Sequence, residues 1–128
     1  MLVLAEAFKM VVQQPIMMIL VFIGSLIGLV FGAIPGLTAT TGVALALPLT
    51  FALNPEMGMA LLIGIYVGGI SGGFIAATLL GIPGTPASIA TCFDAYPLSQ
   101  QGQPVKALGI GVIASFIGTL GSIICLIY

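Results

Sequence analysis

The stretches GAIPGLTATT at residues 32–41 and GIPGTPASIAT at residues 81–91 look like one element used twice. Each contains Ile-Pro-Gly, each follows a long apolar run with regularly spaced glycines, and each continues into small and hydroxyl-bearing residues. Proline removes a backbone hydrogen-bond donor and clashes with the preceding helical turn, whereas glycine permits positive φ. We therefore predict that one helix ends at Pro35-Gly36 and another at Pro83-Gly84.

The composition indicates a membrane protein. Of the 128 residues, 60% are hydrophobic and 4% are charged, and the mean hydropathy is +1.34. An ordinary soluble domain carries about 25% charged residues. The charged side chains are Glu6, Lys9, Glu56, Asp94 and Lys106. They are too few to cover a soluble fold of this size, so we predict an all-α integral membrane protein.

The same composition excludes several classes of function. The chain has no basic patch for nucleic acid. It has no His, and Cys92 and Cys125 lie far apart, so the spacing of a zinc site is absent and both cysteines are expected to be reduced, apolar residues. No base or nucleophile pair accompanies Asp94, the one carboxylate near the second break, so we do not expect an enzyme. No cofactor is expected beyond a coupling Na⁺ or H⁺.

Three uncharged runs are long enough to cross a bilayer, and they predict helices near 16–33, 57–80 and 107–127. Small residues recur at every fourth position of each run. These residues are Gly24, Gly28 and Gly32, then Gly64, Gly68 and Gly72, then Gly111, Ser115 and Thr119. Such a stripe lies on one face of a helix and lets a second helix approach closely. We expect the first two stripes to face protein rather than lipid.

The segment 37–53 between the first two runs has two interpretations. It forms either a re-entrant half-helix or a full, kinked span, because Pro48 weakens its second half. If it is re-entrant, 57–80 runs opposite to 16–33; if it crosses fully, the two run parallel. We favour the re-entrant form, because the Thr-rich start and Pro48 make a poor lipid-facing span.

Two more polar segments flank these runs. Residues 1–14 are interpreted as a short helix lying in the membrane interface, with a frayed start as the alternative. Residues 98–106, LSQQGQPVK, are predicted to form a polar loop.

Paired breaks inside a membrane point to a binding site. Broken helices are tolerated only where protein or a water-filled cavity covers the freed backbone groups. Corresponding breaks in two segments mark a transporter's binding site, since half-helix N-termini face anions and freed carbonyls hold Na⁺. The candidate substrate- or ion-binding residues are Pro35, Gly36, Thr38, Thr40, Pro83, Gly84, Thr85, Ser88 and Asp94. The alternatives are that a Pro-Gly pair merely ends a helix at the lipid surface, and that Asp94 is an interface loop residue.

The motifs PGLTATTGVALALP from Pro35 and YVGGISGGFIAATLLGIPGTPASIATCFDAYPLSQQG from Tyr66 resemble the large membrane subunit of tripartite tricarboxylate transporters, the TctA family. The resemblance implies a multi-pass permease of the bacterial inner membrane for citrate-like or other carboxylates. It implies transport driven by an ion gradient rather than by ATP. It also implies two partners, a small membrane subunit and a periplasmic solute-binding protein.

This sequence departs from the family in two ways. The family's loop usually reads Asp-Gly-Tyr-Pro, where this chain has Asp94-Ala95-Tyr96-Pro97. Family members are also several times longer, so residues 1–128 are interpreted as a single transmembrane domain, the N-terminal part of a larger permease and one part of a transporter repeat. A second class of function stays open, a small structural or interaction subunit of a membrane complex with no substrate site. The paired breaks and their hydroxyls favour the permease.

Overall fold

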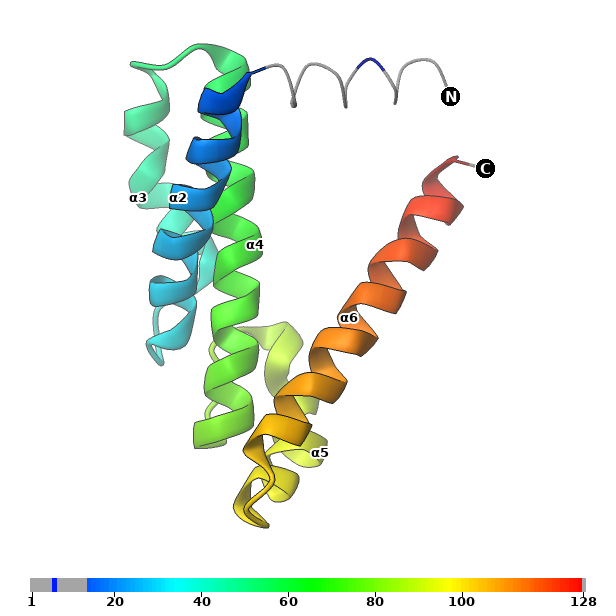
Figure 1. The fold of residues 1–128 in the computed structure, drawn as a ribbon. Coiled ribbons are helices and arrows are strands. Elements are labelled where there is room, and N and C mark those ends of the chain that lie inside the picture. Colours follow the sequence, from blue (N-terminus) through cyan, green and yellow to red (C-terminus); the bar gives the residue numbers. More distant parts are fainter. Residues whose placement is uncertain (1–5, 7–13, 128) are drawn as a thin grey trace.

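The computed structural model describes Glu6 and residues 14–127, so most of the predicted interfacial segment 1–14 lies outside the described residues. The described chain forms helices and no strands (Figure 1). In order they are α2 (Pro15–Ala33), α3 (Ala39–Thr50), α4 (Pro55–Leu80), the 3-10 helix η1 (Pro86–Ser88), α5 (Ile89–Gln100) and α6 (Pro104–Ile127). Among them α2, α4 and α6 are long and apolar enough to cross a membrane, so the predicted all-α membrane class is confirmed.

Proline opens each of these three long helices. Pro15, Pro55 and Pro104 are the first residues of α2, α4 and α6. The first N–H of a helix has no partner within the helix, and the fixed φ of proline suits the first turn. The starts of the long helices are thus set by local sequence.

Both predicted breaks are helix ends. α2 ends at Ala33, before the first Pro-Gly pair, and α4 ends at Leu80, before the second. The chain passes through the left-handed region at Gly36, with φ of 93°, and at Gly81, with φ of 69°. At the second break the reversal therefore takes place at Gly81, ahead of the proline.

The glycine stripes of α2 and α4 pack directly against each other. A Cβ built on Gly28 would overlap the Ile65 carbonyl oxygen, and one on Gly68 would overlap the Ser25 carbonyl oxygen. The stripe residues Gly24, Gly28, Gly32, Gly64, Gly68 and Gly72 are all buried. The prediction that both stripes face protein is confirmed, and each stripe has the other as its partner.

These contacts also set the relative direction of the two helices. Gly24 faces Leu61, and Gly32 faces Gly69, so the residue numbers rise together along the interface. α2 and α4 therefore run parallel, side by side (Figure 1).

The favoured re-entrant interpretation of residues 37–53 is wrong. α3 runs antiparallel to α4 and carries the chain back along it, with Ala39 beside Gly69 and Thr50 beside Gly58. Small buried residues on one face of α3, which are Ala39, Gly42 and Ala46, dock on protein. A segment that is partly covered by α4 is not required to be a good lipid-facing span, which is why its Thr-rich start and Pro48 are tolerated.

The chain instead turns back into the bundle after the second break. From Gly81 the chain runs back along α4, opposite to the direction of that helix, and Gly84 packs against Gly73. A Cβ added to Gly84 would lie 2.7 Å from the Gly73 Cα. After η1, α5 runs in the same direction as α4 (Figure 1). The ring of Tyr96 on α5 packs against Gly81 at the end of α4. The chain therefore folds back on the bundle after α4 rather than after α2.

The predicted polar loop is a short turn. Residues 98–100 end α5, residues 104–106 begin α6, and only residues 101–103 lie outside the helices. Ala95 lies within α5, and no non-glycine residue in the described chain has positive φ. Alanine in place of the family's glycine is therefore unstrained, because this part of the chain is helix and not a turn.

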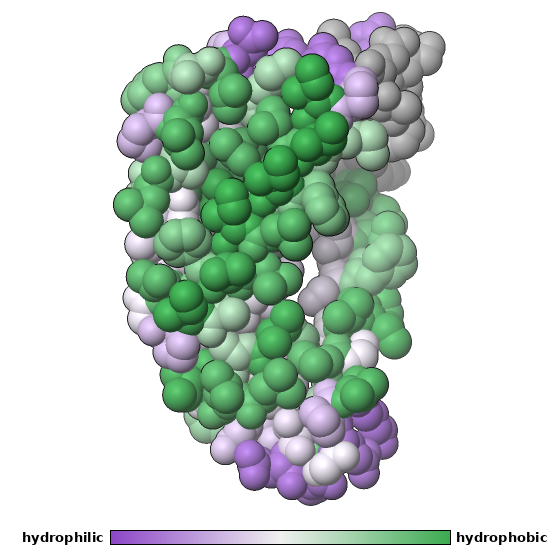
Figure 2. All heavy atoms as spheres, turned by 60° about the vertical axis from the view of Figure 1, so that its left-hand side comes forward, coloured by the Kyte–Doolittle hydropathy of each residue, from purple (hydrophilic) through white to green (hydrophobic). Residues whose placement is uncertain are grey.

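Hydrophilic residues gather at the two ends of the bundle, with a hydrophobic band between them (Figure 2). One end carries the starts of α2 and α4, with Gln14, Asn54 and Glu56 exposed, and the other carries the exposed turn residues 101–103. This pattern is the one expected of helices that span a bilayer.

We predict that Gly28→Ala or Gly68→Ala lowers the membrane abundance of the intact permease. Each new methyl group overlaps a carbonyl oxygen of the facing helix, so the helices must separate along the stripe. Abundance is measured by immunoblot of membranes and by elution from size-exclusion chromatography in detergent.

Gly118→Ala and Gly121→Ala are the matched controls, since a Cβ at either position meets no heavy atom within 4 Å in the described structure. Alanine favours a helix interior over glycine by roughly 1 kcal/mol, so these variants are expected to hold or gain abundance. Equal abundance in all four variants contradicts the packing described above.

Candidate functional site

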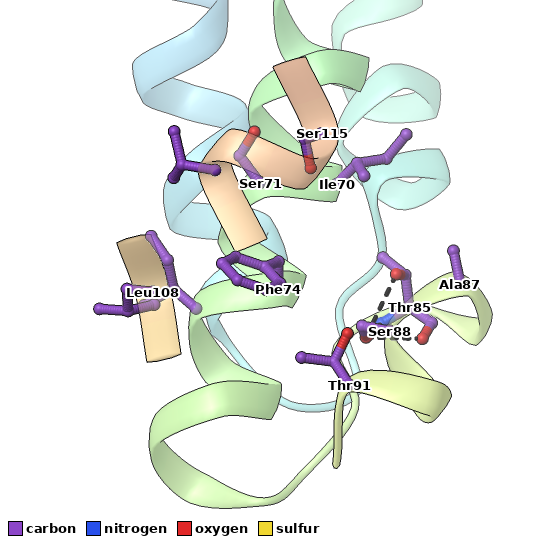
Figure 3. Close-up of a pocket in the computed structure, with 11 residues that line it drawn as sticks. Ile70, Ser71, Phe74, Thr85, Ala87, Ser88, Thr91, Leu108 and Ser115 are labelled. Atoms are coloured by element: carbon purple, nitrogen blue, oxygen red, sulfur yellow. Dashed lines mark hydrogen bonds between the residues drawn. The ribbon is translucent and has the colours of Figure 1, made fainter. Parts of the chain in front are cut away.

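A cleft of about 510 Å³ lies between α4, the η1–α5 junction and α6 (Figure 3). We call it the hydroxyl cleft, because its polar lining consists only of hydroxyl-bearing residues. These are Ser71, Thr85, Ser88, Thr91 and Ser115. The remaining lining residues, Ile70, Phe74, Ile75, Ala87, Leu108 and Val112, are apolar. The hydroxyl cleft therefore offers hydrogen-bond donors and acceptors but no formal charge.

Thr85 and Ser88 form a small buried network at the second break. The Ser88 Oγ accepts a hydrogen bond from the Thr85 N–H at 3.2 Å and donates to the Thr85 carbonyl oxygen at 2.8 Å. The Thr85 Oγ1 donates to the Ser88 Oγ at 3.4 Å. Both residues are buried. The network satisfies backbone groups that the break leaves outside a regular helix, and it leaves the Thr85 Oγ1 free to accept a further hydrogen bond.

The other three hydroxyls differ in their availability. The Ser71 Oγ donates to the Val67 carbonyl oxygen at 3.0 Å, within its own helix. Across the described residues, the hydroxyls of Thr91 and Ser115 make no hydrogen bond with protein. They are the side chains of the hydroxyl cleft with a donor to offer.

A second cleft, of about 390 Å³, lies between α5 and α6 on the other side of Phe74. We call it the carboxylate cleft, because Asp94 lines it. Its remaining lining residues are Phe74, Ala90, Thr91, Ala95, Leu98, Ala107, Ile110 and Gly111. Phe74 and Thr91 line both clefts, so the two are neighbours.

The structure distributes the residues predicted at the second break over these clefts. Thr85 and Ser88 line the hydroxyl cleft, and Asp94 lines the carboxylate cleft. Gly84 is buried between Gly73 and the Gly32 carbonyl oxygen, where only a glycine fits. Pro83 is exposed.

The residues predicted at the first break lie outside both clefts. Pro35, Gly36 and Thr40 are exposed, and Thr38 is half-buried. Thr38 caps α3, because its Oγ1 accepts a hydrogen bond from the Thr41 N–H at 3.3 Å. The two breaks do approach each other, since Gly84 lies against the Gly32 carbonyl oxygen near the end of α2. A ligand-binding role for either group stays a prediction.

Three of the hydroxyls that line the cleft, those of Ser71, Thr91 and Ser115, are not among the site residues predicted from the sequence, although Thr91 belongs to the second break motif. In the sequence, Ser115 belongs to a stripe of small residues. Ser71 lies between the glycines of α4, and no sequence pattern there indicates a binding role. The structure brings them to one cleft because α6 returns antiparallel to α4, with Gly111 beside Phe74. A hydroxyl within a small-residue stripe is the one signal that marked Ser115.

Two comparisons with known proteins found a match. A family model described as "Tripartite tricarboxylate transporter TctA family" matches residues 18–128. A curated protein of Agrobacterium vitis, described as "Uncharacterized 52.8 kDa protein in TAR-I ttuC' 3'region", is 34% identical over 102 residues. The aligned region is 80% of this chain and 20% of that relative, so the chain spans about a fifth of the relative's length. No solved structure matches the chain.

We predict that Ser88→Ala destabilises the intact permease by about 1–3 kcal/mol, the range for a buried donor left without its partner. The variant removes the acceptor of the buried Thr85 N–H. The thermal unfolding midpoint in detergent, followed by circular dichroism, is the measurement.

Ser115→Ala is the matched control, since it makes the same chemical change in the same cleft at a hydroxyl without a protein hydrogen bond in the described structure. Its midpoint is expected to equal that of the unmodified protein. An unchanged midpoint for Ser88→Ala counts against a structural role for the Thr85–Ser88 network.

Proposed function

Because the chain belongs to the TctA family of tripartite tricarboxylate transporters, we propose that it forms part of a permease that moves a carboxylate substrate, citrate-like or related, across the bacterial inner membrane. An ion gradient, of Na⁺ or H⁺, drives the transport. A small membrane subunit and a periplasmic solute-binding protein complete the transporter.

The observation that carries this proposal is the hydroxyl cleft at the second break, within the residues matched by the family. Its volume of about 510 Å³ falls within the roughly 300–1,000 Å³ of typical small-molecule sites. Carboxylate oxygens accept hydrogen bonds, and the Thr91 and Ser115 hydroxyls have donors to offer. This chain would therefore hold the substrate through hydroxyl dipoles.

The absence of Lys and Arg from the cleft lining has an energetic consequence. An anion taken out of water without a countercharge carries a large desolvation penalty. A cation that enters with the substrate offsets that penalty. Co-transport with a cation, as proposed above, would supply that offset from the substrate side.

Asp94 is the candidate residue for that cation. It is the only acidic residue after Glu56, and it lines the cleft next to the hydroxyl cleft. A free carboxylate at this place repels an anionic substrate, and a cation bound at Asp94 offsets the repulsion. We therefore expect the cation to bind before the substrate.

The second candidate function is a structural or interaction subunit without a substrate site. One observation favours it, which is that every described side chain from Val112 to Leu126 on α6 is exposed and available to neighbouring subunits. Such a surface is equally expected of one part of a longer permease, whereas two clefts with polar lining have no role in a purely structural subunit. The permease is therefore the better supported function.

We predict that Thr85→Val in the intact permease weakens substrate or ion binding by about 1–3 kcal/mol, or roughly 5–150-fold, without loss of folded protein. Valine keeps the shape of Thr85 but removes the hydroxyl that lines the cleft. Uptake of labelled citrate into proteoliposomes, with both partner subunits and an imposed Na⁺ or pH gradient, gives the apparent affinity.

Thr40→Val serves as the control, because Thr40 is exposed at the first break and lines neither cleft. It is expected to leave affinity unchanged. If Thr85→Val also leaves affinity and ion dependence unchanged, the second break is not part of the site.

We also predict that Asp94→Asn removes the dependence of uptake on the cation gradient, because the neutral amide does not attract a cation by charge. Glu56→Gln, at the opposite polar end of the bundle, is the matched control and retains that dependence. The measurement is the initial uptake rate against the imposed gradient. Full gradient dependence in Asp94→Asn removes Asp94 from the coupling mechanism.

A further inference from the structure

We propose that one exposed face of α4 is the docking site of a further transmembrane helix of the permease, outside residues 1–128, and that this helix accepts a hydrogen bond from the Tyr66 hydroxyl. The face consists of Ile63, Tyr66, Val67 and Ile70, and we call it the Tyr66 face. That the helix belongs to a permease rests on the proposed function. That the face is covered by protein rests on the position of Tyr66.

Tyr66 lies deep in the hydrophobic band. It is near the middle of the 26-residue helix α4, so a rise of about 1.5 Å per residue places it more than about 15 Å from either end of that helix. Tyrosines that contact lipid are typical of the membrane–water interface, where water satisfies the hydroxyl. A tyrosine side chain is much shorter than the roughly 15 Å half-thickness of the hydrocarbon core, so the Tyr66 hydroxyl does not reach either interface.

The Tyr66 hydroxyl has no hydrogen-bond partner among the described residues, and its side chain is 51% exposed. Other hydroxyls of the spanning helices bond to their own backbone, because a short side chain reaches a carbonyl one turn earlier. Ser25 donates to the Phe22 carbonyl oxygen at 2.8 Å, and Thr119 donates to the Ser115 carbonyl oxygen at 2.7 Å. The tyrosine ring holds its hydroxyl away from the backbone of α4. A partner for Tyr66 in hydrocarbon therefore has to come from another element.

The Tyr66 face has the spacing of a helix-packing surface. Its four residues stand at positions i, i+3, i+4 and i+7, so they lie on one side of α4. The contact with α2 uses a different side, at Gly64, Gly68 and Gly72. α6 leaves the Tyr66 face uncovered, since it diverges from α4 beyond Gly111 (Figure 1). Ile70 also lines the hydroxyl cleft, so a helix docked on the Tyr66 face lies beside that cleft.

The outer face of α2 differs from the Tyr66 face in chemistry. Its exposed large side chains, such as Ile19, Ile23 and Leu26, are apolar and need no partner in hydrocarbon. We therefore assign the outer face of α2 to lipid and the Tyr66 face to protein.

The remainder of the permease chain is the source of the docked helix. The aligned region is only 20% of the curated relative, so most of the protein around these helices lies outside that region. At the depth of Tyr66 the docked helix carries a hydrogen-bond acceptor. This acceptor is a serine or threonine hydroxyl, an asparagine or glutamine carbonyl, or a backbone carbonyl freed at a break.

Spin labels distinguish a protein contact from lipid and from water. The intact permease, freed of all native cysteines including Cys92 and Cys125, carries a nitroxide at Ile63→Cys or at Ile23→Cys. It is reconstituted into lipid vesicles without its partner subunits. The two isoleucines are a matched pair, being 53% and 43% exposed and at similar depth, because Gly64 lies against the backbone of Val21 and Ser25.

Collision rates of the nitroxide with oxygen, which enters hydrocarbon, and with a water-soluble nickel chelate are measured by electron paramagnetic resonance. The label at Ile23→Cys is expected to collide often with oxygen and rarely with the chelate. The label at Ile63→Cys is expected to collide rarely with both, with an oxygen rate several-fold below that at Ile23→Cys.

Three results overturn the proposal. An oxygen rate at Ile63→Cys equal to that at Ile23→Cys places the Tyr66 face in lipid. A high chelate rate at Ile63→Cys places it in a water-filled cavity. A low oxygen rate that appears only after the small membrane subunit is added, or only in dimers of the permease, identifies a different occupant.

Tyr66→Phe tests the hydrogen bond itself, because it removes the hydroxyl and keeps the ring. The thermal unfolding midpoint of the intact permease is expected to fall, since the acceptor on the docked helix is left without its donor. Tyr96→Phe is the matched control, because Tyr96 lies one turn before the end of α5 and close to the exposed turn at residues 101–103, where water satisfies its hydroxyl. It is expected to leave the midpoint unchanged.

An unchanged midpoint for Tyr66→Phe overturns the hydrogen bond to the docked helix. Neither measurement depends on transport. A permease that shows the expected collision rates and midpoints but takes up no carboxylate counts against the proposed function alone.

Discussion

The structure depends on the direct backbone contact between α2 and α4. Hydrocarbon supplies no hydrophobic drive for helix pairing, so association rests on close packing, and the stripes around Gly28 and Gly68 allow it. Because the two helices run parallel, α3 has to return along α4, and both Pro-Gly breaks lie towards the same end of the pair. The contact between Gly84 and the Gly32 carbonyl oxygen follows from that arrangement.

The excursion after α4 is the part of the fold that creates polar lining inside the hydrophobic band. A chain that turns back into a membrane must satisfy its backbone groups within itself. Ser88 does so for both the N–H and the carbonyl of Thr85, and Gly84 lets the segment approach α4 without a side chain in between. The same few residues thus make the excursion possible and form one wall of the hydroxyl cleft.

The charge of the two clefts bears on how a member of a tricarboxylate transporter family could bind an anion. The two neighbouring clefts differ in character, one neutral and rich in hydroxyls, the other lined by a carboxylate. A neutral lining binds an anion weakly unless a cation accompanies it, and a carboxylate attracts that cation. In the proposed function, the hydroxyl cleft would take the carboxylate substrate and the neighbouring carboxylate of Asp94 would attract the cation.

The sequence by itself determined the features that depend on local chemistry, which are the membrane helices, their ends before Pro35 and Pro83, and the protein-facing stripes. Composition, proline and four-residue periodicity act within a few turns of one helix. Helix direction was not determined in this way, because the crossing of α3 depends on the docking of Ala39 and Gly42 on α4. Only the tertiary structure decided that Ser71 and Ser115 share a cleft, because long-range packing places α4 beside α6.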